Sequence, residues 1–397
     1  MAILSLPLRW PSPSPGGWKR VAADGSPEGG AGFPGRTSGF LSSLGIMAGS
    51  RRVRLVLVSV LASLALVSVA HHYHALPDAA SAVWRKPGGA TDLDAAVVNW
   101  SSFAYVQYVT NSNYLCNSVM IMETLHRLGS RPDRILLYPS MMLEPDATSS
   151  TSHDGQLLLR ARDEYGAKLI PISVQSRNSA DETWAESFTK LLAFNQTQYA
   201  RVLSLDSDAL LLQTMDELFL LPPSPLAMPR AYWLAPTADS GTIIATDAQR
   251  ETKFTSTIML VTPSTSEFDR VMAAVATASH DAYDMEVVNA LYGDTARVLP
   301  HRPYVLLSQV LRWESDAERA LYLGEGVAWN AERLVAEAKY VHFSDWPIPK
   351  PWLPTPPGLK VDKQPKCAAG LETCVERELW NGWYDEYRGR REKICSH

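Results

Sequence analysis

Two carboxylates interrupt an apolar run near the middle of the chain. The run that begins at Arg201 continues as Val-Leu-Ser-Leu, gives Asp206-Ser207-Asp208, and returns at once to Ala-Leu-Leu-Leu. A buried strand that ends in this triplet places both carboxylates at the carboxyl edge of a sheet, where open α/β folds bind ligands. Carboxylate oxygens suit Mg²⁺ or Mn²⁺, which can bridge to the phosphates of a nucleotide. The triplet therefore predicts a divalent-cation site, unless it is only a solvated turn after a strand.

Composition excludes some partners. The chain has 397 residues, is 46% hydrophobic, and carries 37 Lys and Arg against 42 Asp and Glu, for a net charge of -5. Such a length can bury a large core, and such a charge does not indicate a polyanionic partner, so we expect no nucleic acid to bind. The 12 Trp and 15 Tyr could include rings that stack on sugars or nucleobases. Ordinary core packing accounts for most of them.

The first hundred residues are unlike the rest. Residues 1–50 are rich in Pro, Gly and Ser and are expected to form a disordered cytoplasmic tail. Residues 51–74 hold three arginines and then an uncharged apolar run at 55–70, which predicts a transmembrane anchor with the amino terminus in the cytoplasm. Residues 75–100 are interpreted as a stem, and 101–397 as the catalytic domain.

Two features of this region stay open. Ser68-Val69-Ala70 resembles a signal-peptide cleavage site, so a secreted form is the alternative to the anchor. Met47 stands just before the arginines and could be the true start.

Cysteines and glycosylation sequons agree with a lumenal domain. Asn99-Trp-Ser and Asn195-Gln-Thr are sequons. Four cysteines allow three pairings; Cys367 and Cys374 are close enough in sequence for a local disulfide, and Cys116 is interpreted as a buried thiol on a helix.

Strand and helix patterns alternate along the catalytic domain. Alternating units of this length predict an α/β fold with a mostly parallel sheet covered on both faces. The expected strands are 103–109, 134–138, 168–172, one from 202, 232–235 and 257–261, and the expected helices are 115–128, 156–165, 183–194, 266–278 and 286–292.

A series of motifs follows the same order as in a known family. In chain order they are Thr110-Asn111-x-x-Tyr114, Thr189-Lys190-Leu191, Asp206-Ser207-Asp208, Phe254-Thr255-Ser256, Ser279-x-Asp281-x-x-Asp284 with Asn289, and His342-Phe343 with Lys350-Pro351-Trp352. Over residues 103–352 the chain resembles glycosyltransferase family 8, the glycogenin-like group, and within it the fungal Golgi α-N-acetylglucosaminyltransferases.

The resemblance implies a fold, a cofactor and a location. It implies a GT-A type nucleotide-diphospho-sugar transferase, with a Rossmann-like sheet, that uses a UDP-sugar and Mn²⁺ (or Mg²⁺). It also implies a single-pass type II protein of the Golgi membrane whose partners are a nucleotide sugar and a glycan acceptor.

Individual roles follow from the matched positions. The resemblance implies that Asp206, Asp208 and His342 bind the metal and that Asp284 and Asp281 contact the donor sugar as catalytic residues. Tyr114 would stack on uracil. The full set expected to bind the nucleotide sugar is Thr110, Asn111, Tyr114, Lys190, Asp206, Ser207, Asp208, Ser256 and Lys350.

Departures from the glycogenin pattern concern the sugar. Thr255 stands where those proteins have Asn, Met285 where they have Gln, and the interval from His342 to Lys350 is two residues longer. These changes favour UDP-N-acetylglucosamine over UDP-glucose or UDP-galactose, while the metal and nucleotide contacts are kept.

The family retains the anomeric configuration, and two mechanisms fit retention. A double displacement would use a carboxylate near the anomeric carbon, for which Asp284 is the candidate. A same-face attack, in which the leaving phosphate takes the acceptor proton, needs no such residue.

Two other functions are alternatives to a transferase. One is a catalytically silent glycan-binding relative, and the other is a phosphohydrolase, which would need ligands for a second metal.

Overall fold

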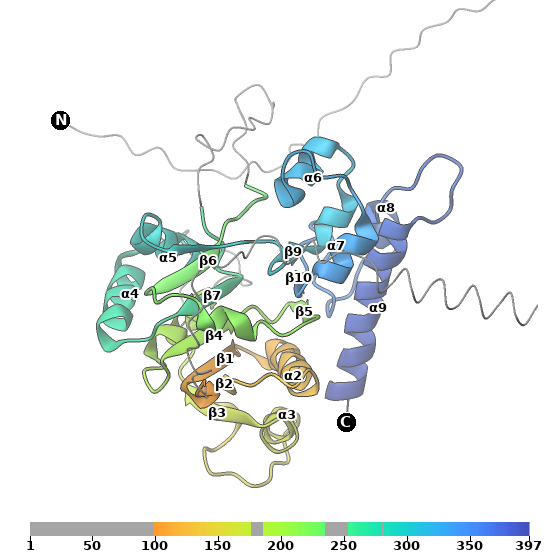
Figure 1. The fold of residues 1–397 in the computed structure, drawn as a ribbon. Coiled ribbons are helices and arrows are strands. Elements are labelled where there is room, and N and C mark those ends of the chain that lie inside the picture. Colours follow the sequence, from red (N-terminus) through yellow and green to blue (C-terminus); the bar gives the residue numbers. More distant parts are fainter. Residues whose placement is uncertain (1–97, 176–185, 235–252, 280–281, 397) are drawn as a thin grey trace, which may run out of the picture. The chain divides into compact units, whose positions relative to one another are not determined.

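The computed structural model describes residues 98–175, 186–234, 253–279 and 282–396 (Figure 1). They lie in one compact unit that runs from Asp94 to His397. The predicted tail, anchor and most of the stem lie outside the described residues, as does Asp281. Within the described ranges, no helix is both long and apolar enough to cross a membrane.

A sheet of seven strands forms the centre of the unit. Its order is β3 (Ala167–Ile172), β2 (Asp133–Pro139), β1 (Phe103–Tyr108), β4 (Arg201–Leu205), β7 (Ile258–Val261), β6 (Leu226–Pro229) and β8 (Arg297–Leu299). Four of the six strand pairs are parallel, and β7 is antiparallel to both β4 and β6. The predicted α/β class with a mostly parallel sheet is therefore confirmed.

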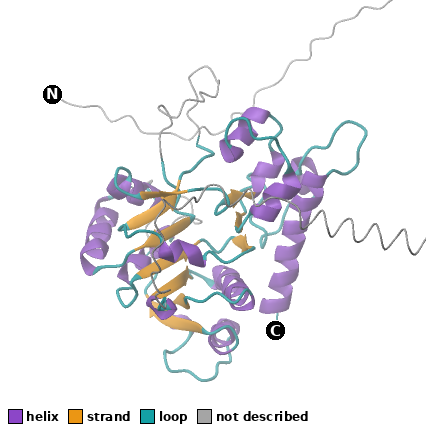
Figure 2. Ribbon diagram, viewed as in Figure 1, coloured by secondary structure: helices purple, strands orange, loops and turns teal. Residues whose placement is uncertain are grey.

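Helices cover both faces of this sheet (Figure 2). Side chains alternate along β1, so that Tyr105 enters one hydrophobic cluster while Ala104 and Val106 enter another. The first cluster includes α2 (Ser112–Arg127) and α3 (His153–Asp163). The second includes the 3₁₀ helix η4 (Ser187–Asn195), α4 (Thr265–Thr277) and α5 (Asp284–Tyr292). Strands buried on both faces explain the continuous apolar runs in the sequence.

A small second sheet lies beside the end of β4. It has the order β5 (Ala209–Leu211), β10 (Tyr340–His342) and β9 (Leu306–Leu307). β10 runs antiparallel to β5, with His342 opposite Ala209. The pairing therefore brings the carboxyl-terminal part of the chain to the residues that follow Asp208.

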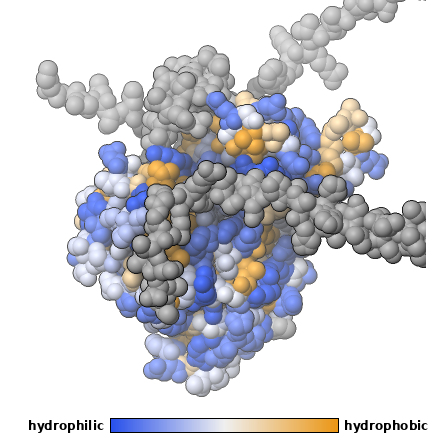
Figure 3. All heavy atoms as spheres, viewed as in Figure 1, coloured by the Kyte–Doolittle hydropathy of each residue, from blue (hydrophilic) through white to orange (hydrophobic). Residues whose placement is uncertain are grey.

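The remaining elements are short helices and one long helix. They are η2 (Trp100–Ser102), η3 (Ser140–Met142), η5 (Asp216–Leu220), η6 (Ser308–Arg312), α6 (Asp316–Leu323), α7 (Ala331–Glu337), α8 (Leu359–Lys363) and α9 (Val375–Cys395). On the face that Figure 3 shows, hydrophilic residues dominate and hydrophobic ones form small separate patches.

Helix α9 is fastened to α2. Arg391 donates to the Asn117 side chain at 2.6 Å, and Cys395 forms a disulfide with Cys116, 279 residues earlier in the chain. The interpretation of Cys116 as a thiol is therefore wrong, although it is buried on a helix as expected. Sequence spacing could not reveal the pair, because only the packing of α9 on α2 brings the two cysteines together. The Cys367–Cys374 disulfide is confirmed.

Two expected elements differ from the structure. Of the strand expected at 232–235, the described residues 232–234 form none, because Leu234 donates to the Ala231 carbonyl in a turn and the strand β6 ends before it. The ring of Tyr232 packs on His301 and Tyr322, so its aromatic signal reflects core packing. The helix expected at 183–194 is a 3₁₀ helix over its described part, buried from Ser187 to Phe194.

The two disulfides should differ in their effect on stability. Chain entropy predicts a loss of roughly 5 kcal/mol when the 279-residue loop is opened by Cys116→Ser with Cys395→Ser, and roughly 2 kcal/mol when the 7-residue loop is opened by Cys367→Ser with Cys374→Ser. Guanidinium chloride unfolding of the domain measures both. An equal loss of free energy in the two variants would show that loop length does not control the effect.

Candidate active site

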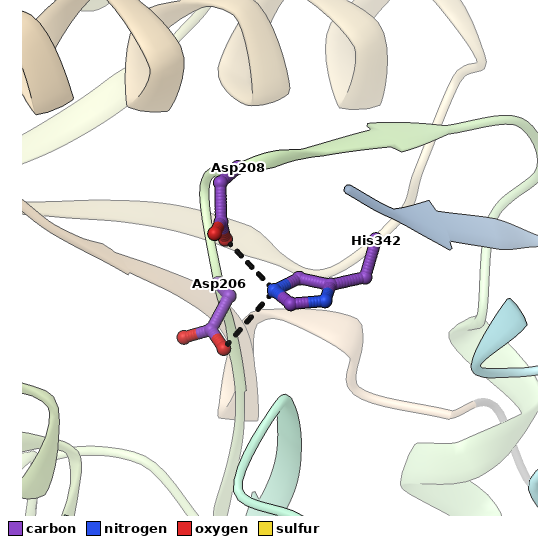
Figure 4. Close-up of side chains that lie close together, drawn as sticks. All are labelled: Asp206, Asp208 and His342. Atoms are coloured by element: carbon purple, nitrogen blue, oxygen red, sulfur yellow. Dashed lines mark ion pairs between the residues drawn. The ribbon is translucent and has the colours of Figure 1, made fainter. Parts of the chain in front are cut away.

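Asp206, Asp208 and His342 form one cluster at the end of β4. Their ligand atoms lie within 4.8 Å of one another. The Nε2 atom of His342 is 3.1 Å from Oδ1 of Asp208 and 4.0 Å from Oδ2 of Asp206, and both carboxylates face the ring (Figure 4). Ligands about 2.1 Å from one ion lie about 3 Å apart in octahedral geometry, so the spacing fits a shared divalent cation.

Each of these carboxylates uses its second oxygen for a lysine. Lys190 Nζ is 2.6 Å from Oδ1 of Asp206, and Lys350 Nζ is 2.5 Å from Oδ2 of Asp208. The remaining oxygens, Oδ2 of Asp206 and Oδ1 of Asp208, face His342. Two carboxylate oxygens and an imidazole nitrogen form a donor set that suits Mn²⁺ or Mg²⁺. The residues present therefore fit the predicted metal.

Burial and charge act together on this cluster. Burial alone raises the pKa of Asp208, but His342 and Lys350 outweigh it and hold that pKa well below its usual range. Burial raises the pKa of Asp206, and Lys190 offsets only part of this rise. For Lys190, burial lowers the pKa, whereas Asp206 and Asp284 raise it well above its usual range. Lys190 is therefore a permanent cation inside the site.

Lys190 connects its own motif to three others, those of Asp206, Ser256 and Asp284. Its ammonium lies 2.9 Å from Oδ2 of Asp284 as well as beside Asp206, and it is 3.3 Å from the carbonyl and 3.4 Å from the hydroxyl of Ser256. Its side chain is only 5% exposed. The structure thus brings Asp284 and Ser256 to the metal cluster, as far as the described residues reach; Asp281 lies outside them.

Two tyrosines that the sequence did not single out hold Asp206. Tyr108 donates to Oδ1 of Asp206 at 3.1 Å, and Tyr340 donates to its backbone carbonyl at 2.7 Å. Burial raises the pKa of Tyr108 well above its usual range, so its phenol stays a donor. The parallel register, which pairs Val106 with Ser204, places Tyr108 level with Asp206 and is the signal that could have identified it.

The first motif lies at the start of α2. The Asn111 side chain accepts from the backbone of Asn113 at 3.1 Å and of Tyr114 at 3.4 Å, which caps the helix. The amide of Asn111 also contacts the Thr110 hydroxyl at 3.4 Å. The ring of Tyr114 meets the edge of Trp352 at 5.4 Å. The first and last motifs are therefore neighbours.

Phe254 and Asn289 fix each other. The backbone N–H of Phe254 donates to Oδ1 of Asn289, and Nδ2 of Asn289 donates to the Phe254 carbonyl, both at 2.8 Å. The same Nδ2 atom donates to the carbonyl of Met285 at 2.8 Å. The Asn289 amide is thus used by the protein backbone, and it orients the loop that carries Ser256.

The segment after β10 closes back on Asp208. Phe343 donates its N–H to the Asp208 carbonyl at 3.0 Å, and Lys350 Nζ donates to the Phe343 carbonyl at 2.6 Å. Ser207, between the two carboxylates, is 5% exposed. Of the predicted residues, Tyr114 contacts Trp352 at the end of this segment, and Lys190, Ser256 and Lys350 surround the carboxylates of Asp206 and Asp208.

Comparison with known proteins gives several relatives named glucose N-acetyltransferase 1. Glucose N-acetyltransferase 1 of Gibberella zeae is 51% identical over 299 residues, which are 75% of this chain and 63% of that protein. The protein of the same name from Aspergillus fumigatus is 40% identical over 329 residues, 78% of this chain and 81% of its own length. The protein of this name from Saccharomyces cerevisiae is 27% identical over 412 residues, which cover 75% of this chain and 82% of that protein. The chain thus spans less than two thirds of the Gibberella zeae relative.

No family model matches the chain. Among solved structures, the galactosyltransferase LgtC in complex with donor and acceptor sugar analogues has a TM-score of 0.41 and 12% identity, over 72% of this chain and 99% of that one. A likeness at this level carries no conclusion.

The relatives are named as transferases, which agrees with the prediction that this chain is a transferase enzyme. Because the Aspergillus fumigatus protein is 40% identical over more than two thirds of both chains, this chain belongs to the glucose N-acetyltransferase 1 family.

Proposed function

We propose that the chain is a retaining, metal-dependent glycosyltransferase of family 8 with a GT-A fold, which transfers N-acetylglucosamine from UDP-N-acetylglucosamine to a glycan or glycoprotein. The observation that carries the proposal is the cluster of Asp206, Asp208 and His342, with a lysine on each carboxylate. A nucleotide diphosphate needs cationic charge, and this cluster can provide it in two forms, as fixed ammonium groups and as a bound cation.

The metal would be held by Asp206, Asp208 and His342. A divalent ion there would act as a Lewis acid that neutralises charge on the departing diphosphate. The charge of the site supports this assignment, because three carboxylates, of Asp206, Asp208 and Asp284, face the ammonium groups of Lys190 and Lys350. With a neutral imidazole at His342, as metal binding requires, these groups carry one net negative charge, which would repel a diphosphate unless a further cation is bound.

The lysines supply charge that is already oriented. Lys190 is buried among Asp206, Asp284 and Ser256, and Lys350 is held by Asp208 and the carbonyl of Phe343. Because both ammonium groups are fixed before the donor binds, little reorganisation is required when charge develops on the leaving phosphate. This supports their proposed role in binding the nucleotide sugar.

Asp284 is the candidate for a nucleophile in a double displacement. Its backbone N–H donates to the hydroxyl of Ser187 at 3.3 Å, and its Oδ2 meets Lys190 at 2.9 Å. Lys190 thus lies between the carboxylate of Asp284 and that of Asp206, which is one of the proposed metal ligands. A same-face attack would use the same site without a covalent step, and both mechanisms retain configuration.

The donor sugar is proposed from the two departures from the glycogenin pattern. Thr255 is 2% exposed and its hydroxyl lies 2.7 Å from that of Thr257, so it is engaged within its own loop. Met285 replaces an amide with an apolar side chain. A less polar wall suits an acetamido methyl, whose burial contributes about 1 kcal/mol. The name of the relatives joins glucose with an N-acetyl group, both of which are parts of N-acetylglucosamine.

The proposed location is the Golgi membrane, with residues 51–74 as a type II anchor and the domain in the lumen. Both sequon asparagines, Asn99 and Asn195, are exposed, and the domain carries two disulfides. Disulfides form and persist in oxidising compartments, which supports a secretory location.

Asp208→Asn tests the metal site. The substitution keeps shape but removes the charge that pairs with His342 and Lys350, so we expect Mn²⁺-dependent UDP release to fall by about 100-fold or more while circular dichroism stays unchanged. Asp163→Asn is the matched control, because among the described residues its exposed carboxylate pairs with the neighbouring Arg162 and no other cation. Full Mn²⁺-dependent activity in Asp208→Asn would contradict the metal assignment.

The donor is tested with a panel of UDP-sugars and Mn²⁺, scored by release of UDP with and without a mannose-ended acceptor. UDP-N-acetylglucosamine should be preferred because the wall at Thr255 and Met285 favours the acetamido group. A preference for UDP-glucose or UDP-galactose would refute the donor while leaving the transferase intact. Absence of turnover with every donor would support the catalytically silent alternative.

Topology is tested on the full-length protein in cells. A retained anchor predicts resistance to carbonate extraction, glycosylation at Asn99 or Asn195, and an amino terminus open to cytosolic protease. A secreted form beginning at His71 would instead indicate cleavage. Deletion of residues 1–75 should leave an active domain in either case.

A further inference from the structure

A turn beside the metal cluster presents one large aromatic side chain to solvent. Residues 345–348 form the turn, in which Ile348 donates to the Asp345 carbonyl at 2.9 Å. Asp345 is 3% and Ile348 is 6% exposed, yet Trp346 between them is 76% exposed. Because Asp345 and Ile348 are buried, the exposure of Trp346 does not come from a loop that stands away from the protein.

Asp345 holds this turn from inside. Its carboxylate accepts hydrogen bonds from Ser308, from Arg312 at 3.3 Å, and from the hydroxyl of Tyr384 at 2.9 Å. These partners come from η6 and from α9. A buried carboxylate with three donors is costly to move, because any displacement leaves charge unpaired. The position of Trp346 is therefore determined by two other elements of the fold.

The chain also keeps Trp346 near the candidate active site. Trp346 is four residues from His342 and four from Lys350, and both of those side chains contact Asp208, at 3.1 Å and 2.5 Å. A stretch of four residues spans at most about 14 Å. The indole thus stands at a distance from the metal cluster that a short glycan can cover.

Exposed hydrophobic side chains occur singly on most proteins, and alone they indicate nothing. Here a second one follows on the other side of Lys350: Leu353 is 43% exposed, and its N–H donates to the Lys350 carbonyl at 2.8 Å. Exposed apolar side chains therefore flank Lys350 on both sides along the sequence. Rings such as indole bury a large area against the apolar face of a sugar and leave its hydroxyls to polar partners.

We propose that Trp346 is the acceptor platform of this enzyme. One pyranose ring of the acceptor glycan stacks on the indole, while the reactive hydroxyl of the glycan reaches the cluster of Asp206, Asp208 and His342. The proposal rests on the proposed transferase function and adds the acceptor subsite to it. Asp345 is the positioning residue that holds the platform.

Calorimetric titration of mannotriose into the full-length protein, with UDP and Mn²⁺ present, tests the platform. Trp346→Ala should weaken mannotriose binding by about ten-fold or more, and Trp346→Phe, which keeps a ring, should weaken it less. Val361→Ala is the matched control, since Val361 is an exposed apolar residue on α8, 67% exposed. UDP binding should remain at the wild-type level in all three variants.

Three results would overturn the proposal: wild-type protein that does not bind mannotriose, Trp346→Ala protein that binds it as well as wild type, or parallel loss of mannotriose and UDP binding in Trp346→Ala. Failure of the transferase function has a different signature, because it appears as no UDP release from any UDP-sugar whether or not mannotriose binds.

Discussion

The contact of Asp208 with both His342 and Lys350 is the interaction on which the rest of the site depends. It joins residues that are more than a hundred positions apart in the chain, and it does so in a place where burial penalises every charge. Charges so buried stay ionised only if each has a partner at short range. The second sheet satisfies this requirement, because β10 pairs with β5 directly after Asp208 and sets His342 opposite Ala209.

The carboxyl-terminal helix completes this arrangement from behind. Phe343, next to His342, packs against Tyr384 and Tyr387 of α9, and Tyr387 stacks on Trp352. The Cys116–Cys395 disulfide fastens the same helix to α2, whose first turn carries Tyr114. Both ends of the candidate site are thus supported by one helix, whose aromatic side chains Trp380, Trp383, Tyr384 and Tyr387 are buried.

Sequence patterns predicted what depends on local order and missed what depends on packing. The strands β1, β2, β3, β4 and β7 have apolar runs of their own, and their alternation with helices predicts a mostly parallel sheet, although β7 pairs antiparallel with β4 and β6. By contrast, β10 has three residues and depends on its pairing with β5 on one side and β9 on the other. Tyr232 and Cys116 were misread for the same reason, since an aromatic ring or a thiol in sequence does not identify its partner.

The motif residues also show that proximity to a site and contact with a ligand are different properties. Asn289 lies in a motif associated with the donor sugar, yet its amide bonds the backbone at Phe254 and Met285. By holding Phe254 it fixes Ser256, and Ser256 in turn meets Lys190. A substitution at Asn289 would therefore act on the buried ammonium through the loop. Of the groups in the candidate site, those with side chains that bond the backbone shape the site, and those with charges that face one another would carry its proposed chemistry.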